Sequence, residues 1–162
     1  MIIRKAEEKD VRQISEIVAE DWKTAYRGIM DSDFLDSITT EDQYRKDIRR
    51  YNEYTVAAER QQILGFAWNR LIDDEEAADC EVVALYVRLS ERKKGVGRAL
   101  LQDAADTFRK AGRKSMIVWC LKGNAEARRF YEKTGGILYK TGTHQWGNRE
   151  YDIVSYLYRL GQ

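Results

Sequence analysis

The sequence predicts one α/β domain of the α+β kind, with a mixed, mostly antiparallel sheet of about six to seven strands flanked by about four helices. Three observations support this. Residues 54–72 and 137–160 each read as two β-rich runs joined by a short turn, residues 81–121 read as strand, helix and strand, and four stretches have apolar residues at helical spacing. A length of 162 residues suits a single domain, expected to span 1–162.

In the first half, residues 1–5 begin a strand, and Val11 to Tyr26 recur at the spacing of one amphipathic helix. In a second helical stretch, Phe34 and Leu35 come ahead of the capping residues Thr39 and Thr40, and one stripe follows with Tyr44, Ile48 and Tyr51. A hairpin follows, with strands 54–59 and 63–72 around the polar turn 60–62. The acidic segment 73–79 is expected to be a loop.

In the second half, the nearly continuous apolar strand 81–87 leads through a basic loop into a helix that ends at Gly112. Strand 115–121 completes a parallel crossover, because strand, helix and strand alternate here. Asn124 opens a short helix over 125–134 that Gly135 and Gly136 stop. The last hairpin, 137–144 and 150–160, turns at Gly147 and Asn148.

Charge and apolar content exclude several classes of protein. With 28 Lys and Arg against 27 Asp and Glu, the net charge of +1 gives no broad basic surface for nucleic acid or anionic lipid. The apolar run 82–87 is far shorter than the roughly 20 residues of a membrane-spanning helix. We therefore expect a cytoplasmic protein with no nucleic-acid or membrane partner. His144, Cys80 and Cys120 form no zinc-binding spacing, so no metal is expected.

The most informative segment is the loop Arg92-Lys93-Lys94-Gly95-Val96-Gly97. Glycines at a helix start leave unpaired N–H groups and the positive end of the helix dipole open to a diphosphate. A two-glycine turn can also simply begin a helix. The Rossmann pattern needs a third glycine where Leu100 stands, and the Walker pattern needs Gly-Lys-Ser/Thr, so neither nucleotide site fits.

The sequence resembles the GNAT superfamily of acyl-coenzyme A-dependent N-acyltransferases. Residues 92–97 match the family's Gln/Arg-x-x-Gly-x-Gly/Ala motif after a Leu-Tyr-Val strand end, and residues 124–135 are similar to its Asn-Ala…aromatic-Tyr element. The resemblance covers residues 1 to 160. It departs at Lys93, where many relatives carry glycine, and at Leu89, where many carry proline.

The resemblance implies acetyl-CoA as cosubstrate and no metal. It implies that strands 81–87 and 115–121 splay apart, so that backbone of residues 85–87 pairs with the pantetheine arm. The expected cofactor-binding residues are Leu85, Tyr86, Val87, Arg92, Lys93, Lys94, Gly95, Val96, Gly97, Arg98, Asn124 and Arg128. Asn124 also serves as a helix cap, and Arg128 is equally explained as a solvated helix residue.

The chemistry requires a base for the amine and an acid for the departing thiolate. The resemblance assigns the acid to Tyr131, which could otherwise be a core tyrosine, and the base to Glu81, which could otherwise be a solvated strand end. Four residues could line the acceptor pocket, namely Trp22, Tyr26, His144 and Trp146. Core packing explains at least one of the first two, and a position near a turn explains His144.

The predicted function is transfer of acetyl from acetyl-CoA to a primary amine of a small molecule or peptide in a ternary complex. Acetylation of a protein α-amine or lysine is one alternative, and a non-catalytic acyl-CoA sensor is another. Edge strands and aromatic residues also allow a homodimer. The sequence does not identify the acceptor.

Overall fold

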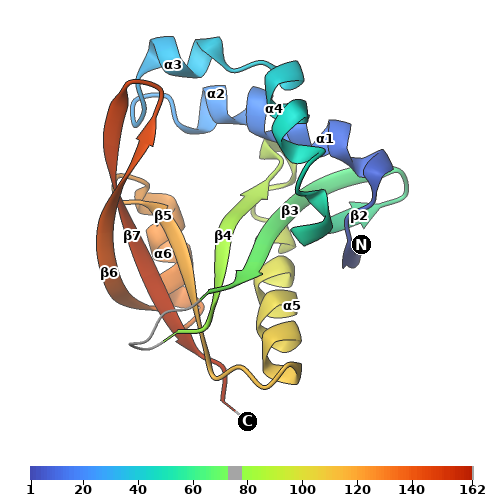
Figure 1. Cartoon of the computed structure of the whole chain (residues 1–162), viewed down its shortest axis with the longest axis vertical. Coiled ribbons are helices and arrows are strands. Elements are labelled where there is room, and N and C mark those ends of the chain that lie inside the picture. The colour runs from blue at the N-terminus through green and yellow to red at the C-terminus, as the bar shows by residue number, and fades with distance from the viewer. Residues whose placement is uncertain (73–77, 162) are drawn as a thin grey trace. The chain divides into compact units, whose positions relative to one another are not determined.

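The computed structural model describes residues 1–72 and 78–161 (Figure 1). Seven strands follow the order β1-β2-β3-β4-β5-β7-β6 within this part of the chain. They are β1 (Ile2–Lys5), β2 (Tyr54–Glu59), β3 (Gln62–Leu71), β4 (Cys80–Val87), β5 (Ser115–Leu121), β6 (Ile137–Trp146) and β7 (Arg149–Arg159). One pair, β4 with β5, is parallel, and the pairs β1–β2, β2–β3, β5–β7 and β6–β7 are antiparallel. The predicted class, a mixed sheet with helices, is confirmed.

The chain divides into two compact units. The first comprises Met1–Trp68 with Leu85–Asp103, and the second comprises Asn69–Ala84 with Ala104–Gln162. The α-helices are α1 (Val11–Glu16), α2 (Trp22–Ala25), α3 (Ser32–Ser37), α4 (Thr40–Asp47), α5 (Val96–Lys110) and α6 (Ala125–Lys133). Within the described residues, no helix combines the length and apolarity that crossing a membrane requires.

The helix predicted over residues 11–26 is continuous but not uniform. A π-helical turn, η2 (Ile17–Asp21), joins α1 to α2. The predicted apolar stripe is confirmed at Val11, Ile14, Val18 and Trp22, which are all buried, whereas its last member, Tyr26, is half-buried and lies just after α2. Since an α-helix advances about 100° per residue, a wider turn moves the side chains that follow it around the axis. Asp21 and Trp22 take their directions from this turn.

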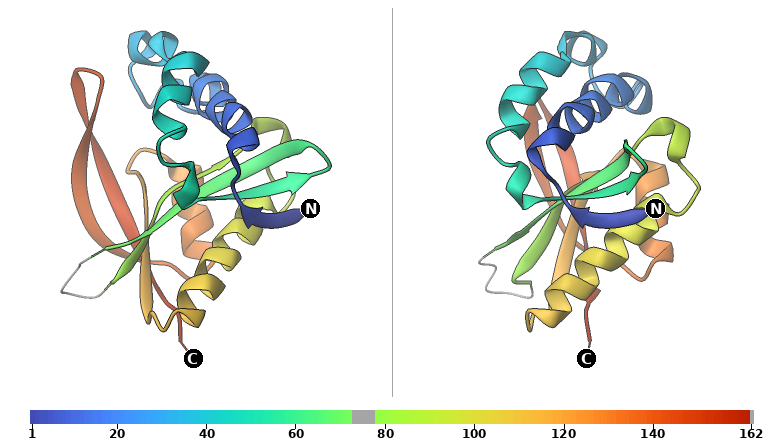
Figure 2. Two further views of the ribbon diagram at one scale, coloured as in Figure 1. Left: turned by 45° about the vertical axis from the view of Figure 1, so that its right-hand side comes forward. Right: turned by 90° about the vertical axis from the view of Figure 1, so that its right-hand side faces the viewer.

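The second predicted helical stretch consists of two helices, each with its own cap. Asp31 accepts a hydrogen bond from Phe34 N and Thr39 Oγ1 accepts one from Asp42 N, both at 3.1 Å. The caps separate α3 from α4, and α4 lies against α1 in both views of Figure 2. Tyr51 lies beyond α4, in the 3-10 turn η3 (Tyr51–Glu53).

A buried carboxylate joins the helices of the first unit to its sheet. Asp47, at the end of α4, is fully buried and accepts hydrogen bonds from Ser15 Oγ at 2.9 Å and Tyr54 Oη at 2.6 Å. Arg50 Nη2 lies 3.7 Å from the same carboxylate. Burial raises the pKa of Tyr54. Because buried polar groups need partners, these bonds fix α1, α4 and β2 in one arrangement.

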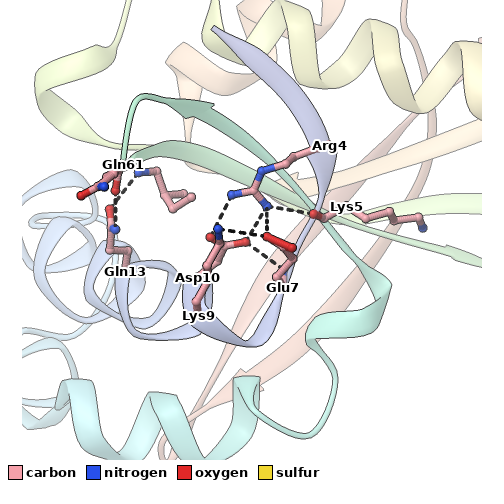
Figure 3. Close-up of polar contacts among 8 residues, drawn as sticks. Arg4, Lys5, Glu7, Lys9, Asp10, Gln13 and Gln61 are labelled. Carbon is pink, nitrogen blue, oxygen red and sulfur yellow. Dashed lines mark hydrogen bonds and ion pairs between the residues drawn. The ribbon is translucent and has the colours of Figure 1, made fainter.

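The N-terminal strand is held by a second carboxylate (Figure 3). Asp10, in the 3-10 turn η1 (Glu8–Asp10), accepts from Arg4 Nη1 at 2.7 Å and Arg4 Nη2 at 3.0 Å. It also accepts from Glu7 N at 2.8 Å. Nearby, Gln13 Nε2 donates to Gln61 O at 2.9 Å, which ties α1 to the turn between β2 and β3. That turn was predicted at this place.

The second unit is built on β5, β7 and β6. β7 pairs with β5 from Arg159 opposite Ser115 to Ile153 opposite Leu121. On its other edge β7 pairs with β6, from Leu157 opposite Ile137 to Arg149 opposite Trp146, and the two strands twist around each other as a long hairpin (Figure 1). The predicted turn at Gly147 is confirmed, and Gly147 has φ +65°. The strands extend closer to the turn than predicted, β6 by two residues to Trp146 and β7 by one residue to Arg149.

Parallel pairing of β4 with β5 is found at Glu81 opposite Ile117 and Val82 opposite Val118, which confirms the predicted crossover. The divergence predicted for the rest of these strands stays a prediction. Of the acidic segment predicted as a loop, residues 73–77 lie outside the described part of the chain. Gly112, predicted to end α5, has φ +83°, the left-handed region that glycine adopts without cost.

Candidate functional site

The predicted phosphate loop is an exposed segment that leads into α5. Residues 92–95 are exposed, whereas Val96, the first residue of α5, is buried. Ala99 N donates to Gly95 O at 3.0 Å and closes the first helical turn. The amides of Val96, Gly97 and Arg98 precede that turn, where a helix has no internal acceptors for its N–H groups. This arrangement suits an anion, because both the amides and the helix dipole favour negative charge.

Two residues of the loop have left-handed backbone. Gly95 has φ +89° with nothing within 4 Å of the place a Cβ would occupy, so its glycine is required by conformation and not by space. Lys93 has φ +63°. A left-handed conformation costs an ordinary residue roughly 1–2 kcal/mol. This explains why glycine suits position 93, where this chain has a lysine in strained backbone.

The loop is held at both ends. Before it, Arg88 N donates to Leu64 O at 2.8 Å, and the 3-10 turn η4 (Leu89–Glu91) follows. After it, Val96 packs next to Gly65, where an added Cβ would lie 3.2 Å from Val96 Cγ1. Inside the loop, Lys94 Nζ lies 3.6 Å from Glu91 Oε1. The loop is therefore attached at both ends to other residues of the first unit, through Leu64 before it and through Val96 beside Gly65 after it.

The end of β4 carries the residues predicted to pair with pantetheine, Leu85, Tyr86 and Val87, all half-buried. Its backbone approaches β3 closely, since a Cβ on Gly65 would lie 2.7 Å from Tyr86 O. The Tyr86 ring contacts Phe66 at 5.4 Å and Trp22 at 5.5 Å between centroids. These rings fix the strand end within the first unit.

Two predicted acceptor residues lie in the same unit. Trp22 is 8% exposed and its ring meets that of Tyr26 edge-on at 5.0 Å. Trp22 is thus part of the core, the alternative that the helical stripe left open. Tyr26, at the end of α2, is half-buried.

In the second unit, Glu81 at the start of β4 is buried, with 7% exposure, and both carboxylate oxygens accept hydrogen bonds. Arg70 Nε donates to Oε1 at 2.7 Å, and Trp119 Nε1 donates to Oε2 at 3.1 Å. The solvated strand end considered from the sequence is therefore wrong. A buried carboxylate fixed by two donors has a defined orientation, which a general base requires.

Tyr131, the predicted acid, is 4% exposed and lies near the end of α6. Its ring contacts Phe130 at 5.4 Å and Tyr156 at 5.8 Å between centroids. Its carbonyl accepts from Gly136 N and Tyr158 Oη, each at 2.9 Å. Backbone and ring are thus both held in place.

Asn124 and Arg128, predicted to bind the cofactor, have structural partners at the start of α6. Asn124 Oδ1 accepts from Ala127 N at 3.1 Å, which is the helix cap also expected from the sequence. Arg128 Nε donates to Tyr156 Oη at 2.9 Å and Nη1 donates to Lys122 O at 3.2 Å. Arg128 is therefore not a merely solvated residue. Contact of either residue with a cofactor stays a prediction.

The other two predicted acceptor residues, His144 and Trp146, lie on β6 with ring centroids 4.2 Å apart. Tyr151, opposite His144 on β7, has its ring 6.0 Å from that of Trp146. The three rings form an aromatic face near the hairpin turn.

Cysteine and metal chemistry have little support. Cys80 and Cys120 are unpaired thiols, and burial raises the pKa of Cys80 to about 12 and that of Cys120 to about 11. A thiol acts as a nucleophile only as thiolate. Among the described residues, no group of three or more His, Cys, Asp and Glu side chains is placed to hold a metal ion.

Sequence reasoning missed several residues that position the predicted ones. Arg70 and Trp119 hold Glu81, Tyr158 holds Tyr131, and Asp21 accepts from Leu89 N at 2.8 Å. Only Trp119 carried a sequence signal, since alternation along β5 places it on the side of Ile117, the residue opposite Glu81.

The fold and the loop define a class of protein, an α/β domain that presents main-chain amides at a helix start after a parallel strand. Residues 12–136 match the family model described as acetyltransferase (GNAT) family, and the chain belongs to this family. Membership makes it an acyltransferase.

Two relatives and one solved structure extend this finding. The uncharacterized N-acetyltransferase YuaI of Bacillus subtilis is 28% identical over 126 residues, 75% of this chain and 72% of its own. A spermidine N(1)-acetyltransferase of Thermoplasma acidophilum is 29% identical over 140 residues, 82% of this chain and 86% of its own. The PaiA N-acetyltransferase of Thermoplasma acidophilum, solved in complex with coenzyme A, has a TM-score of 0.77 at 22% identity, covering 97% of this chain and 98% of its own.

Proposed function

We propose that the protein transfers an acetyl group from acetyl-CoA to a primary amine of a small molecule or peptide by direct attack in a ternary complex. The observation that carries the proposal is the exposed, left-handed Gly95 directly before the buried start of α5. Such a loop presents consecutive amides to a diphosphate. Arg92, Lys93, Lys94 and Arg98 add positive charge beside it.

The rest of the cofactor would lie along the end of β4. Pantetheine amides pair with an exposed strand as an added strand does, so backbone of Leu85, Tyr86 and Val87 serves as partner. A main-chain N–H there also stabilises the oxyanion that forms when the amine attacks the thioester carbonyl. The ring contacts of Tyr86 with Phe66 and Trp22 keep this strand end in place.

Two side chains complete the chemistry. Glu81, directly or through water, accepts the proton that the attacking amine loses. The nitrogen–carbon bond then forms, the carbon–sulfur bond breaks, and Tyr131 donates its phenolic proton to the leaving sulfur. The proposal is supported by the burial of both residues and by the hydrogen bonds that orient Glu81 and the backbone of Tyr131.

Spermidine is the first acceptor to test, because a relative with 29% identity is named a spermidine N(1)-acetyltransferase. The site of action we propose is the cytoplasm, where unpaired thiols such as Cys80 and Cys120 stay reduced. Asn124 and Arg128 belong to the proposed cofactor site, and Tyr26, His144 and Trp146 to the proposed acceptor site.

A thiol-release assay tests the proposal. Purified protein and acetyl-CoA are incubated with spermidine, a peptide with a free α-amine, a peptide with only a lysine amine and intact proteins, and acetylated product is identified by mass spectrometry. Product from spermidine or a short peptide supports the proposal. Product only from intact proteins favours the protein-acetylating alternative, and tight CoA binding without product favours the sensor.

A further inference from the structure

The turn that leads into the diphosphate loop of the first unit donates a hydrogen bond to a helical residue far away in the sequence. Leu89 N donates to Asp21 Oδ2 at 2.8 Å, and the two residues are 68 positions apart. Leu89 is the first residue of η4, the turn that leads directly into Arg92 and the loop.

The carboxylate of Asp21 is committed to this bond and not to its own helix. Asp21 is the residue before α2, where aspartate commonly caps, yet it makes no side-chain cap there. The residue before η4, Arg88, likewise supplies no side-chain cap. The π-helical turn η2 ends at Asp21, so the wider turn sets the direction in which this side chain points.

The bond lies at the end of the loop that is also attached to β3, where Arg88 Nε donates to Ile63 O at 3.1 Å. Arg88 is fixed to β3 through Leu64 O, and the turn closes with Glu91 N donating to Arg88 O at 2.8 Å. From Arg92 to Gly95 the chain is exposed and includes the strained Lys93. The direction in which this strained segment leaves the turn therefore depends on Leu89.

From this geometry we infer that Asp21 is a positioning residue for coenzyme A, and that it pre-orders the loop before the diphosphate binds. Ordering a loop in its binding conformation improves affinity because the entropy of ordering is not lost on binding. The inference rests on the proposed function. It adds a determinant of cofactor affinity that lies on the helical segment η2. The carboxylate acts through the Leu89 amide and does not touch the cofactor.

A double-mutant cycle tests the inference, with the dissociation constant for coenzyme A measured by calorimetry. Asp21→Ala leaves the Leu89 amide without its charged acceptor, and we expect about a tenfold rise in Kd. Glu20→Ala is the matched control, because the neighbouring Glu20 is exposed and loses the same charge without loss of a loop contact. Its Kd should stay within about twofold of wild type.

The second substitution of the cycle removes the hydrogen-bond donor, the main-chain N–H of Leu89. Leu89→Pro suits the backbone, because the first position of a helical turn tolerates proline and Arg88 has the extended ψ of 136° that a residue before proline prefers. Proline has no N–H and fixes its own φ. In this background we expect Asp21→Ala to change Kd less than about twofold, since no amide remains for the carboxylate to hold.

Steady-state kinetics separate positioning from general damage. The KM for acetyl-CoA should follow the change in Kd, whereas kcat at saturating acetyl-CoA should stay within about twofold of wild type. If Asp21→Ala no longer unfolds cooperatively, Asp21→Asn replaces it in the cycle and is measured in both the wild-type and the Leu89→Pro protein. The weaker neutral acceptor should raise Kd about threefold in the wild-type background and leave it unchanged beside proline.

The outcomes are distinguishable. If wild-type protein gives no heat with coenzyme A, the proposed function fails. If wild type binds and Asp21→Ala binds equally well, or if the variant has the same effect in the proline background, the inference fails and the proposed function stands.

Discussion

The phenolic hydroxyl of Tyr158 donates a hydrogen bond of 2.9 Å to the main-chain carbonyl of Tyr131. Burial raises the pKa of Tyr158 to about 12, so the hydroxyl stays protonated and able to donate throughout the neutral range. The Tyr158 ring occupies the space beside Gly136, where a Cβ would lie 2.8 Å from Tyr158 Cζ. The last turn of α6 is thus held by a strand residue, and Tyr131 with it.

Replacing Tyr131 by phenylalanine should lower kcat by about 10²-fold, because general-acid catalysis typically contributes that much or more. Binding of coenzyme A, measured by calorimetry, should stay close to wild type, since only a hydroxyl is removed. Tyr139→Phe, which removes a hydroxyl from a half-buried residue of β6 that no step uses, is the control. Equal turnover by Tyr131→Phe would remove this residue from the mechanism.

Replacing Glu81 by glutamine should abolish the rise of rate with pH that a general base produces, and should lower kcat by about 10²-fold above neutral pH. Trp119→Phe separates orientation from basicity, because it removes only the indole donor at 3.1 Å and leaves the carboxylate with Arg70. Its pH–rate profile should keep its shape at a lower plateau. A Glu81→Gln profile parallel to wild type would assign the base to water or to another group.

Replacing Lys93 by glycine should stabilise the protein by about 1 kcal/mol, because glycine adopts a positive φ without the steric cost that lysine bears. Lys93→Asn, which loses the same charge and tolerates this backbone better than lysine, is the matched variant and should stabilise the protein by less than glycine does. Lys93→Val should destabilise the loop, because a β-branched residue is least suited to a positive φ. Urea unfolding measures the three changes. A valine variant as stable as the glycine variant would contradict the assigned conformation.

Replacing Asp10 by asparagine should lower the free energy of unfolding by about 2 kcal/mol at neutral pH, because two charged hydrogen bonds from Arg4 are lost at a site 5% exposed. Burial alone raises the pKa of Asp10, but the hydrogen bonds from Arg4 and Glu7 N outweigh it and hold that pKa below its ordinary value.

The downward shift of the Asp10 pKa determines how the stability of the protein depends on pH. A carboxyl with a lowered pKa stabilises the folded state above its unfolded pKa of about 4, and its contribution is lost as pH falls through the folded value. The difference between wild type and Asp10→Asn should therefore shrink below about pH 4. Glu41→Gln, at the exposed pair with Arg12, should change stability little at any pH. A difference for Asp10 that is constant down to pH 2 would contradict the assigned role.

Much of the fold could be predicted because local chemistry specifies it. Asn124 and Thr39 act as caps at the predicted places, and the β-hairpin turns lie where polar and glycine residues interrupt apolar runs. The π-helical turn η2 was not predictable. The buried stripe of Val11, Ile14, Val18 and Trp22 continues through it at ordinary helical spacing, so the pattern carries no sign of the wider turn.

The candidate site was predictable only where the residues that form it are adjacent in the sequence. Gly95 and the start of α5 are adjacent in sequence, so their motif is visible there. The partners of Glu81 depend on the register of β3 against β4 and of β4 against β5, which no local pattern sets. Asp21 and Leu89 are brought together by folding across 68 residues, and neither has a sequence context that suggests the other.

The central claim is that main-chain amides ahead of Ala99 bind the diphosphate of coenzyme A. Calorimetric titration with coenzyme A, pantetheine and ATP tests it most directly, because pantetheine lacks the diphosphate and ATP lacks the pantetheine arm. The account predicts that coenzyme A binds at least about 10²-fold more tightly than either, equivalent to about 2.7 kcal/mol. Pantetheine binding as tightly as coenzyme A, or ATP binding more tightly, would contradict it.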